Sequence, residues 1–218
     1  MKKAFASWSG GKDSMLALYR AIRTVEVTYL LNMLSEDGVS SRSHGLNAEL
    51  LRAQATAMGK TIIQRPSSWK GYERTFKEAV LGLKRKGVTV GVFGDIELQE
   101  HRDWIERVCS DLEIEPLFPL WGAGREELIN EFISAGFRAI VVSTNADNLG
   151  KEWLGREING DFVRDLKELG DVDLCGELGE YHTFVFDGPL FRYPVGFRLG
   201  AKRLKGNRWF LEVNHEGY

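Results

Sequence analysis

The chain has 218 residues, of which 43% are hydrophobic and 28% are charged, and its formal net charge is −2. This length suits one sizeable domain or two small ones, and the near-neutral charge excludes a globally basic nucleic-acid-binding protein, although it leaves room for a local basic patch. The chain lacks membrane-spanning apolar runs and a signal-peptide pattern at its start, and Cys109 and Cys175 lack metal-ligand spacing, so we predict a cytoplasmic protein with reduced thiols.

The first half of the chain alternates short apolar runs with amphipathic helical patterns. The runs that we predict as strands are 4–8, 25–34, 61–63, 88–94 and 113–118, and the predicted helices are 15–22, 47–58, 72–86 and 101–112. This alternation indicates right-handed βαβ units and a parallel sheet covered on both faces. In such sheets, ligands bind at the carboxyl ends of the strands.

After residue 124 the pattern changes. We predict helices over 125–135 and 161–169, a strand over 137–143, and a β-hairpin of 197–204 and 208–213 closed at Lys205-Gly206-Asn207. We therefore place residues 1–123 in a first domain and residues 124–218 in a second, smaller α/β domain.

The segment Ser9-Gly10-Gly11-Lys12-Asp13-Ser14 joins the first predicted strand to the first predicted helix. Glycines let the backbone approach a phosphate closely, and a helix N-terminus offers unpaired N–H groups and partial positive charge. Lys12 can reach a phosphate oxygen, Asp13 can hold a bridging Mg²⁺, and the two serines add hydroxyl donors. Asp13 or Ser14 can also cap the helix.

Other interpretations of this segment fit less well. The Walker A pattern fails because residue 6 is alanine and Asp13 follows Lys12. Ser9 and Lys12 have the spacing of a penicillin-binding nucleophile pair, but the companion motifs Ser-Asp-Asn and Lys-Thr-Gly are absent from the sequence. The remaining alternative is an ordinary turn of small residues.

The segment resembles the PP-loop signature Ser-Gly-Gly-x-Asp-Ser of the N-type ATP pyrophosphatases, which cut ATP between the α and β phosphates and transfer AMP to a substrate oxygen. Three further stretches resemble the diphthine–ammonia ligase family, and with the PP-loop the resemblance covers most of the chain. The first consists of Gly94-Asp95-Ile96 together with residues 100–104 and 115–121, the second is 148–156, and the third is 176–185. The resemblance implies a Rossmann-like adenine nucleotide α-hydrolase (HUP/PP-loop) domain. It also implies amidation of the diphthine carboxylate of elongation factor 2.

On this resemblance we expect ATP and Mg²⁺ as cofactors. The predicted nucleotide site contains Ser9, Gly10, Gly11, Lys12, Asp13, Ser14, His44, Gly94 and Asp95, with Lys12 and Asp13 catalytic and with Asp13 and Asp95 on the metal. The alternative interpretation of His44 is a histidine on a surface loop, and the alternative interpretation of Asp95 is a helix cap.

The predicted substrate site contains Glu177, Glu180, Tyr181, His182, Thr183 and Arg156. We interpret residues 176–183 as a polar cluster in a Gly-bearing loop, where the carboxylates can bind ammonium or trimethylammonium and Tyr181 can add a cation–π contact. The alternative interpretation of this cluster is a solvated acidic turn. For Arg156, the alternative to a role in the substrate site is a surface salt bridge. The family usually has Gly-Glu-Gly-Gly-Glu here, and Leu178 replaces its middle glycine. We expect the leucine side chain to narrow the pocket, or to exclude a backbone conformation that glycine allows.

We therefore predict an ATP-dependent ligase that adenylates a carboxylate and lets ammonia displace AMP. The alternatives are another PP-loop adenylating enzyme acting on RNA or a small metabolite, and a nucleotide-binding sensor without turnover. The predicted partners are ATP, ammonium and, where the host makes diphthamide, elongation factor 2. No membrane partner is predicted, and a homodimer is left open.

Overall fold

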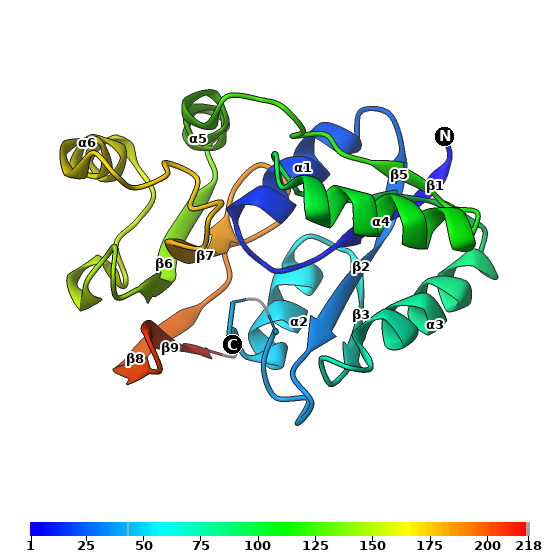
Figure 1. Ribbon diagram of the computed structural model, residues 1–218, viewed down its shortest axis with the longest axis horizontal. Helices are drawn as coiled ribbons and strands as arrows, with labels where there is room; N and C mark the ends of the chain where they lie inside the picture. The colour runs from blue at the N-terminus through cyan, green and yellow to red at the C-terminus, as the bar shows by residue number, and fades with distance from the viewer. Residues whose placement is uncertain (43, 217–218) are drawn as a thin grey trace. The chain divides into compact units, whose positions relative to one another are not determined.

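A computed structural model describes residues 1–42 and 44–216 of the chain (Figure 1). These residues form two compact units, which we describe separately. Unit 1 comprises residues 1–9, 13–42 and 60–122, and the described part of unit 2 comprises 10–12, 44–59 and 123–216. The PP-loop segment is thus shared: Ser9, Asp13 and Ser14 belong to unit 1, and Gly10, Gly11 and Lys12 belong to unit 2.

Unit 1 contains a five-stranded parallel sheet in the order β3-β2-β1-β4-β5. The strands are β1 (Lys3–Ser7), β2 (Glu26–Leu34), β3 (Thr61–Pro66), β4 (Val88–Val92) and β5 (Glu115–Leu117). Because β1 lies in the centre and the chain order reverses beside it, β1 and β4 form the topological switch point at which such sheets bind ligands. The helix α1 (Lys12–Ala21) follows β1 directly.

Two helices of unit 1, α3 (Tyr72–Lys84) and α4 (Gln99–Asp111), pack on the sheet through one buried cluster. The cluster joins Phe5 of β1 and Leu31 of β2 to Phe76 of α3 and Val108 of α4. Burying such side chains contributes roughly 1.5–3 kcal/mol each, so this cluster holds α3 and α4 on the sheet.

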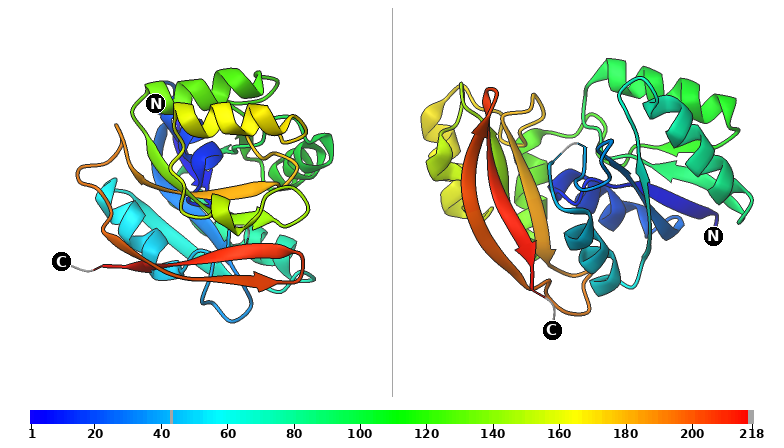
Figure 2. Two further views of the ribbon diagram at one scale, coloured as in Figure 1. Left: turned by 90° about the vertical axis from the view of Figure 1, so that its left-hand side faces the viewer. Right: turned by 90° about the horizontal axis from the view of Figure 1, so that it is seen from below.

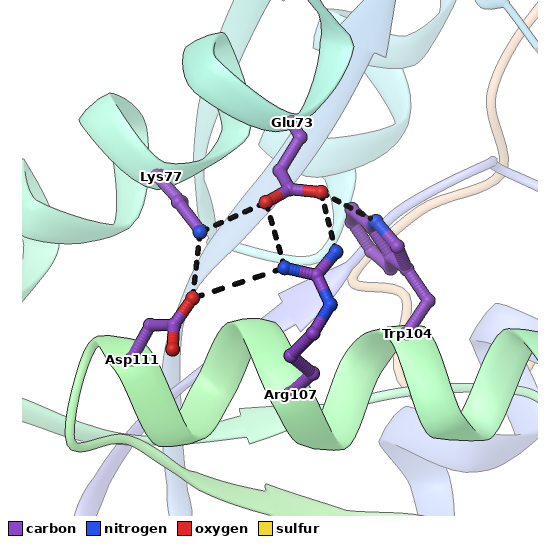
Figure 3. Close-up of polar contacts among 5 residues, drawn as sticks. All are labelled: Glu73, Lys77, Trp104, Arg107 and Asp111. Atoms are coloured by element: carbon purple, nitrogen blue, oxygen red, sulfur yellow. Dashed lines mark hydrogen bonds and ion pairs between the residues drawn. The ribbon is translucent and has the colours of Figure 1, made fainter.

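The same two helices are also joined by a polar network at their surface (Figure 3). The Glu73 carboxylate of α3 accepts hydrogen bonds from Arg107 at 2.6 and 2.9 Å, and from the Trp104 indole at 3.0 Å. Lys77 lies 2.8 Å from Glu73 and 2.7 Å from Asp111. Hydrogen bonds from Arg107 and then Lys77 hold the pKa of Glu73 well below its usual range.

Unit 2 contains a four-stranded antiparallel sheet in the order β7-β6-β9-β8. Its strands are β6 (Arg138–Asn145), β7 (Tyr181–Asp187), β8 (Phe197–Lys205) and β9 (Arg208–His215), and its helices are α2 (Ala48–Ala57), α5 (Arg125–Ser134), the short 3₁₀ helix η1 (Lys151–Trp153) and α6 (Gly160–Leu169). Strands β8 and β9 form a long hairpin (Figure 2). Gly206 closes it with a φ of 59°, a conformation that glycine adopts without strain.

The sequence predicted most of these elements correctly. The parallel sheet of the first half, the helices and the closing hairpin are confirmed, with boundaries that differ by a few residues. One interpretation is wrong: residues 181–183 do not lie in a loop but begin the unpredicted strand β7. A second is wrong as well, because α1 begins at Lys12 and so contains Asp13 and Ser14 in its first turn instead of being capped by them.

Both cysteines are free and buried, as expected for reduced thiols. Burial raises the pKa of the Cys109 thiol to about 11, so it is an unreactive core residue. In the described part of the chain, no helix combines the length and the apolar character that crossing a membrane requires.

Candidate nucleotide and substrate site

The unit 1 part of the predicted site starts where β1 ends. The hydroxyl oxygens of Ser9 and Ser14 lie 3.1 Å apart, so the residues before and after the glycine turn are joined by a hydrogen bond. Asp13 lies in the first turn of α1. The positive end of the helix dipole and the N–H groups of this turn favour an anion here.

Gly94 and Asp95 follow β4, the strand beside β1, after one intervening residue. A Cβ atom on Gly94 would lie 3.0 Å from the carbonyl carbon and oxygen of Asp13 and from the amide nitrogen of Ser14. Glycine is therefore required for the two backbones to approach, and this approach brings the segment containing Asp95 next to Asp13. Asp95 does not cap α4, whose N-cap is Leu98. Instead, Oδ1 of Asp95 lies 3.3 Å from Nδ1 of His101.

These two carboxylates suit the predicted Mg²⁺. Magnesium is usually bound by one or two carboxylates and completes its octahedron with phosphate oxygens and water. Asp13 and Asp95 provide carboxylates at neighbouring strand ends, while the described residues contain no group of three or more potential ligand side chains that could hold a metal on their own. The donor set therefore fits a metal carried in with a nucleotide.

Lys12, in unit 2, is held by the segment that leads into β7. Its side chain is only 4% exposed. The ammonium donates a hydrogen bond to the carbonyl oxygen of Cys175 and lies 5.0 Å from the centre of the Tyr181 ring. The backbone N–H of Lys12 donates to the Thr183 hydroxyl at 3.0 Å, which satisfies one of the N–H groups that a helix start leaves unpaired.

Gly10 is fixed to β7 and α2 by its carbonyl oxygen. This oxygen accepts hydrogen bonds from the Val185 amide at 3.0 Å and from the Gln54 side chain at 3.0 Å. The Gln54 amide nitrogen also donates to the Val185 carbonyl at 2.6 Å. Gly10 has a φ of 84°, and an added Cβ would lie 2.3 Å from Leu51, so only glycine fits here.

His44 and His182 stack on each other beside the glycine turn. Their ring centres are 4.5 Å apart with an angle of 18° between the planes, and a Cβ on Gly11 would lie 2.2 Å from Cε1 of His44. The Nδ1 of His44 lies 3.0 Å from the carbonyl oxygen of Thr183. Because a carbonyl only accepts, Nδ1 carries the proton, and Nε2 of a neutral His44 is left as an acceptor.

Both imidazoles are neutral at physiological pH. Burial lowers the pKa of His44 to about 4, against a smaller opposing effect of its hydrogen bond to Thr183, and the charges of Lys12 and Arg208 lower it further. Burial also lowers the pKa of His182 well below its usual value, with further lowering by His44, Arg208 and Lys12. This group of residues in unit 2 therefore combines fixed positive charge with neutral rings.

Glu180 is a buried carboxylate at the start of β7. It is 5% exposed, its Oε1 accepts a hydrogen bond from the Asp173 amide at 3.3 Å, and its Oε2 has no hydrogen-bond partner among the residues that the structure describes. The nearby Arg208 guanidinium donates to the carbonyl oxygen of Gly179 and to the Ser143 hydroxyl at 3.2 Å. Burial lowers the pKa of Arg208, and the charge of Glu180 opposes that shift.

The other predicted substrate residues have different surroundings. Arg156 forms an ion pair with Asp165 at 2.6 Å and stacks on Trp153 at 4.4 Å. Glu177 is half-buried, and its amide lies 3.4 Å from Oδ1 of Asp173. The Leu178 side chain is exposed and its backbone has no positive φ, so its conformation does not require glycine.

The structure therefore brings most of the predicted residues into two local groups. Unit 1 places Asp13, Ser14 and Gly94 together with Asp95 adjoining, and unit 2 places Gly11, Lys12, His44, His182 and Thr183 together. Arg156 is not in contact with either group in the interactions described above. Sequence reasoning missed Gln54, Arg208 and the Cys175 carbonyl. Gln54 alone carried a signal, as a polar residue between Leu51 and Ala55 on the apolar face of a predicted helix.

A parallel sheet with a Gly-Gly-Lys-Asp turn between its central strand and the next helix defines an α/β protein of the PP-loop type. Comparison with known proteins then narrows this class. Residues 1–116 match the diphthamide synthase N-terminal domain and residues 124–216 match the diphthamide synthase C-terminal domain. The chain belongs to the diphthamide synthase family.

Relatives with curated names agree with this assignment. The human diphthine–ammonia ligase is 33% identical over 212 residues, which cover 86% of this chain and 79% of the human protein. The zebrafish (Danio rerio) diphthine–ammonia ligase is 36% identical over 116 residues, half of this chain and 43% of that protein. Among solved structures, a predicted tRNA methyltransferase subunit from Methanocaldococcus jannaschii has a TM-score of 0.47 and 16% identity, covering 87% of this chain and 98% of that one.

Proposed function

We propose that this protein is an ATP-dependent ligase that adenylates the diphthine carboxylate of elongation factor 2 and lets ammonia displace AMP. The observation that carries the proposal is the intact PP-loop at the end of the central strand, with Lys12 and Asp13 both present in a chain of the diphthamide synthase family. A sensor that only binds a nucleotide needs neither residue. Release of AMP and pyrophosphate is the expected outcome.

Adenylation is needed because a carboxylate oxygen is a poor leaving group for attack by ammonia. The carboxylate attacks the α-phosphate, pyrophosphate leaves, and ammonia then displaces AMP from the acyl carbon. The protein's main task is to position the groups and stabilise negative charge. We assign this task to the ammonium of Lys12, which exchanges its Cys175 carbonyl for a phosphate oxygen, and to the amides of residues 10–14.

Mg²⁺, when bound with the nucleotide, would supply positive charge that offsets the negative charge of the phosphates. We propose that Asp13 and Asp95 hold it, directly or through water. In the nucleotide site we also retain Ser9, Ser14, Gly94 and His44. The neutral His44, with Nε2 as an acceptor, is suited to an N–H or O–H donor of a ligand.

For the acceptor we propose Glu177, Glu180, Tyr181, His182, Thr183 and Arg156. The unpaired Oε2 of Glu180 supports a cationic ligand there, ammonium or the trimethylammonium group of diphthine, because a buried carboxylate oxygen is costly without a partner. The Tyr181 ring already faces Lys12, so a cation–π contact to the acceptor requires Lys12 to move toward a phosphate.

Several further assignments belong to this proposal. They are the division into an ATP-binding domain of residues 1–123 and a substrate-binding domain of residues 124–218, a cytoplasmic location, ammonium as the nitrogen source, and self-association as a homodimer. The family membership supports the domain division and ammonium, and the composition supports the cytoplasmic location.

The test compares Lys12→Ala with Lys70→Ala, which removes an exposed lysine outside the site. With ATP, ammonium and diphthine-bearing elongation factor 2, the Lys12 variant should lose pyrophosphate release while its unfolding curve stays cooperative, and the Lys70 variant should match the wild type. Wild-type turnover by the Lys12 variant would refute the PP-loop assignment. Turnover of ATP to AMP without amidation of diphthine would indicate a different acceptor.

A further inference from the structure

Three neighbouring side chains at the carboxyl end of β2 in unit 1 have buried polar atoms that lack hydrogen-bond partners in the described part of the chain. These atoms are Oγ of Ser41, Nε of Arg42 and Oγ of Ser67. Ser41 is 2% exposed and Ser67 is 5% exposed. Buried polar atoms are nearly always paired in native proteins, so three unpaired ones at one place need an explanation.

Backbone hydrogen bonds fasten all three residues to the last two residues of β2. Ser41 forms a bridge with Leu34, the Arg42 amide donates to the Met33 carbonyl at 3.1 Å, and the Ser67 amide donates to the Leu34 carbonyl at 3.3 Å. The Arg42 guanidinium also donates to the Ser67 carbonyl. The segments after β2 and after β3 are therefore joined at one point, and the arrangement is built by the backbone.

The chemistry of this group suits an anion. The guanidinium of Arg42 is always charged, and its Nε–H can form one arm of a two-point contact with a carboxylate or phosphate. The two hydroxyls can each add a donor. The Trp69 ring lies 4.5 Å from the guanidinium and is itself 78% exposed, so the cover over Arg42 is a side chain with little packing to hold it in place.

We propose that Ser41, Arg42 and Ser67 form an oxyanion-binding subsite for a carboxylate or phosphate group of the acceptor, covered by Trp69. This rests on the proposed function and assigns to the acceptor an anion separate from the carboxylate that is adenylated. The separation follows from the sheet: β2 lies beside β1, which leads to Ser9, and β3 lies one strand further. Neighbouring strands are about 5 Å apart, so the subsite is one to two strand spacings from the end of β1.

The first experiment uses inorganic phosphate and acetate, in separate titrations, on the full chain. The readouts are the NMR signal of the Arg42 Nε–H group and the part of the tryptophan emission that Trp69→Phe removes, since the chain has six tryptophans and Trp8 lies beside the PP-loop. Both readouts report on this place. Binding should shift the Nε–H signal and change the Trp69 emission, and the anion that binds more tightly identifies the class. A lack of response to both anions would mean that water alone satisfies these atoms, and would overturn the proposal.

The variants are Arg42→Lys, which keeps the charge but removes Nε–H, Ser67→Ala, and the exposed neighbour Lys70→Ala as the matched control. Arg42→Lys should weaken anion binding by about tenfold, since hydrogen bonds to charged groups are among the stronger ones, and Ser67→Ala should weaken it less. Lys70→Ala should have no effect. If Lys70→Ala weakened anion binding equally, general surface charge and not this subsite would bind the anion, and the proposal would be overturned.

In turnover assays, Arg42→Lys should raise the KM for the acceptor about tenfold and leave the KM for ATP unchanged. An equal rise in the KM for ATP would place Arg42 in the nucleotide site and overturn the proposal. The proposed function fails separately, through unchanged pyrophosphate release by Lys12→Ala, so the two failures are distinguishable.

Discussion

Gln54 joins the glycine turn to strand β7, and its replacement is the most direct test of how unit 2 holds that turn. Its fully buried side-chain amide donates to the carbonyl oxygens of Gly10 at 3.0 Å and Val185 at 2.6 Å. Gln54→Met keeps the volume and removes both donors. Each lost hydrogen bond costs about 0.5–1.5 kcal/mol, so we expect the loss of both to lower the free energy of unfolding by about 1–3 kcal/mol.

The assay is urea unfolding followed by circular dichroism, with Thr56→Ala on the exposed side of the same helix as the control. The control should stay within about 0.5 kcal/mol of the wild type. Titration calorimetry should also show weaker ATP binding by Gln54→Met, because a less rigid Gly10 carbonyl leaves the turn less preorganised. A change below about 0.5 kcal/mol together with unchanged ATP affinity would refute the idea that Gln54 holds the turn.

Three other predictions follow from the contacts described above. Between pH 6.5 and about 4, unfolding takes up a proton on His44 that the folded protein excludes, so the free energy of unfolding should fall with decreasing pH, by up to about 3 kcal/mol from His44. The lowered pKa of His182 adds to this fall, so in urea titrations His44→Gln should make the profile less steep and leave the part that belongs to His182. Glu73→Gln breaks the α3–α4 network of exposed and half-exposed groups (Figure 3) and should lower the free energy of unfolding by only about 0.5–1 kcal/mol. The control Glu78→Gln, on the exposed side of α3, should lower it less. An equal loss for both variants would contradict the role of the network. Gly94→Ala should weaken ATP binding at least about tenfold, since the added Cβ meets backbone atoms at 3.0 Å that cannot move independently. The control is Gly160→Ala, where an added Cβ has open space around it, and this variant should bind ATP normally.

The parallel sheet could be predicted from sequence because its signals are local. Each strand of unit 1 is a short apolar run, and each is followed by a helical period that a reader can count along the chain. The PP-loop could be found for the same reason, since its six residues are consecutive. Gly87, the residue after the predicted helix 72–86, has a positive φ of 85°, as a glycine after a helix end commonly does.

The surroundings of the site could not be predicted in this way, because they depend on residues far apart in sequence. The Thr183 hydroxyl that pairs with the Lys12 amide is 171 residues away, and no local pattern links the two. Strand β7 was missed because Tyr181, His182 and Thr183 at its start are polar enough to resemble a functional loop. Burial of Thr183 and Tyr181 in the sheet, and not their intrinsic preference, decides that they form a strand.

The central claim is that this chain activates a carboxylate by adenylation. The most direct measurement uses diphthine-bearing elongation factor 2 whose diphthine carboxylate is labelled with ¹⁸O, incubated with ATP, Mg²⁺ and ammonium and followed by mass spectrometry of the nucleotide and of the modified peptide. The proposed mechanism predicts amidated peptide, pyrophosphate, and AMP that carries one ¹⁸O atom from the carboxylate. Formation of ADP, or of AMP without the label, would contradict it.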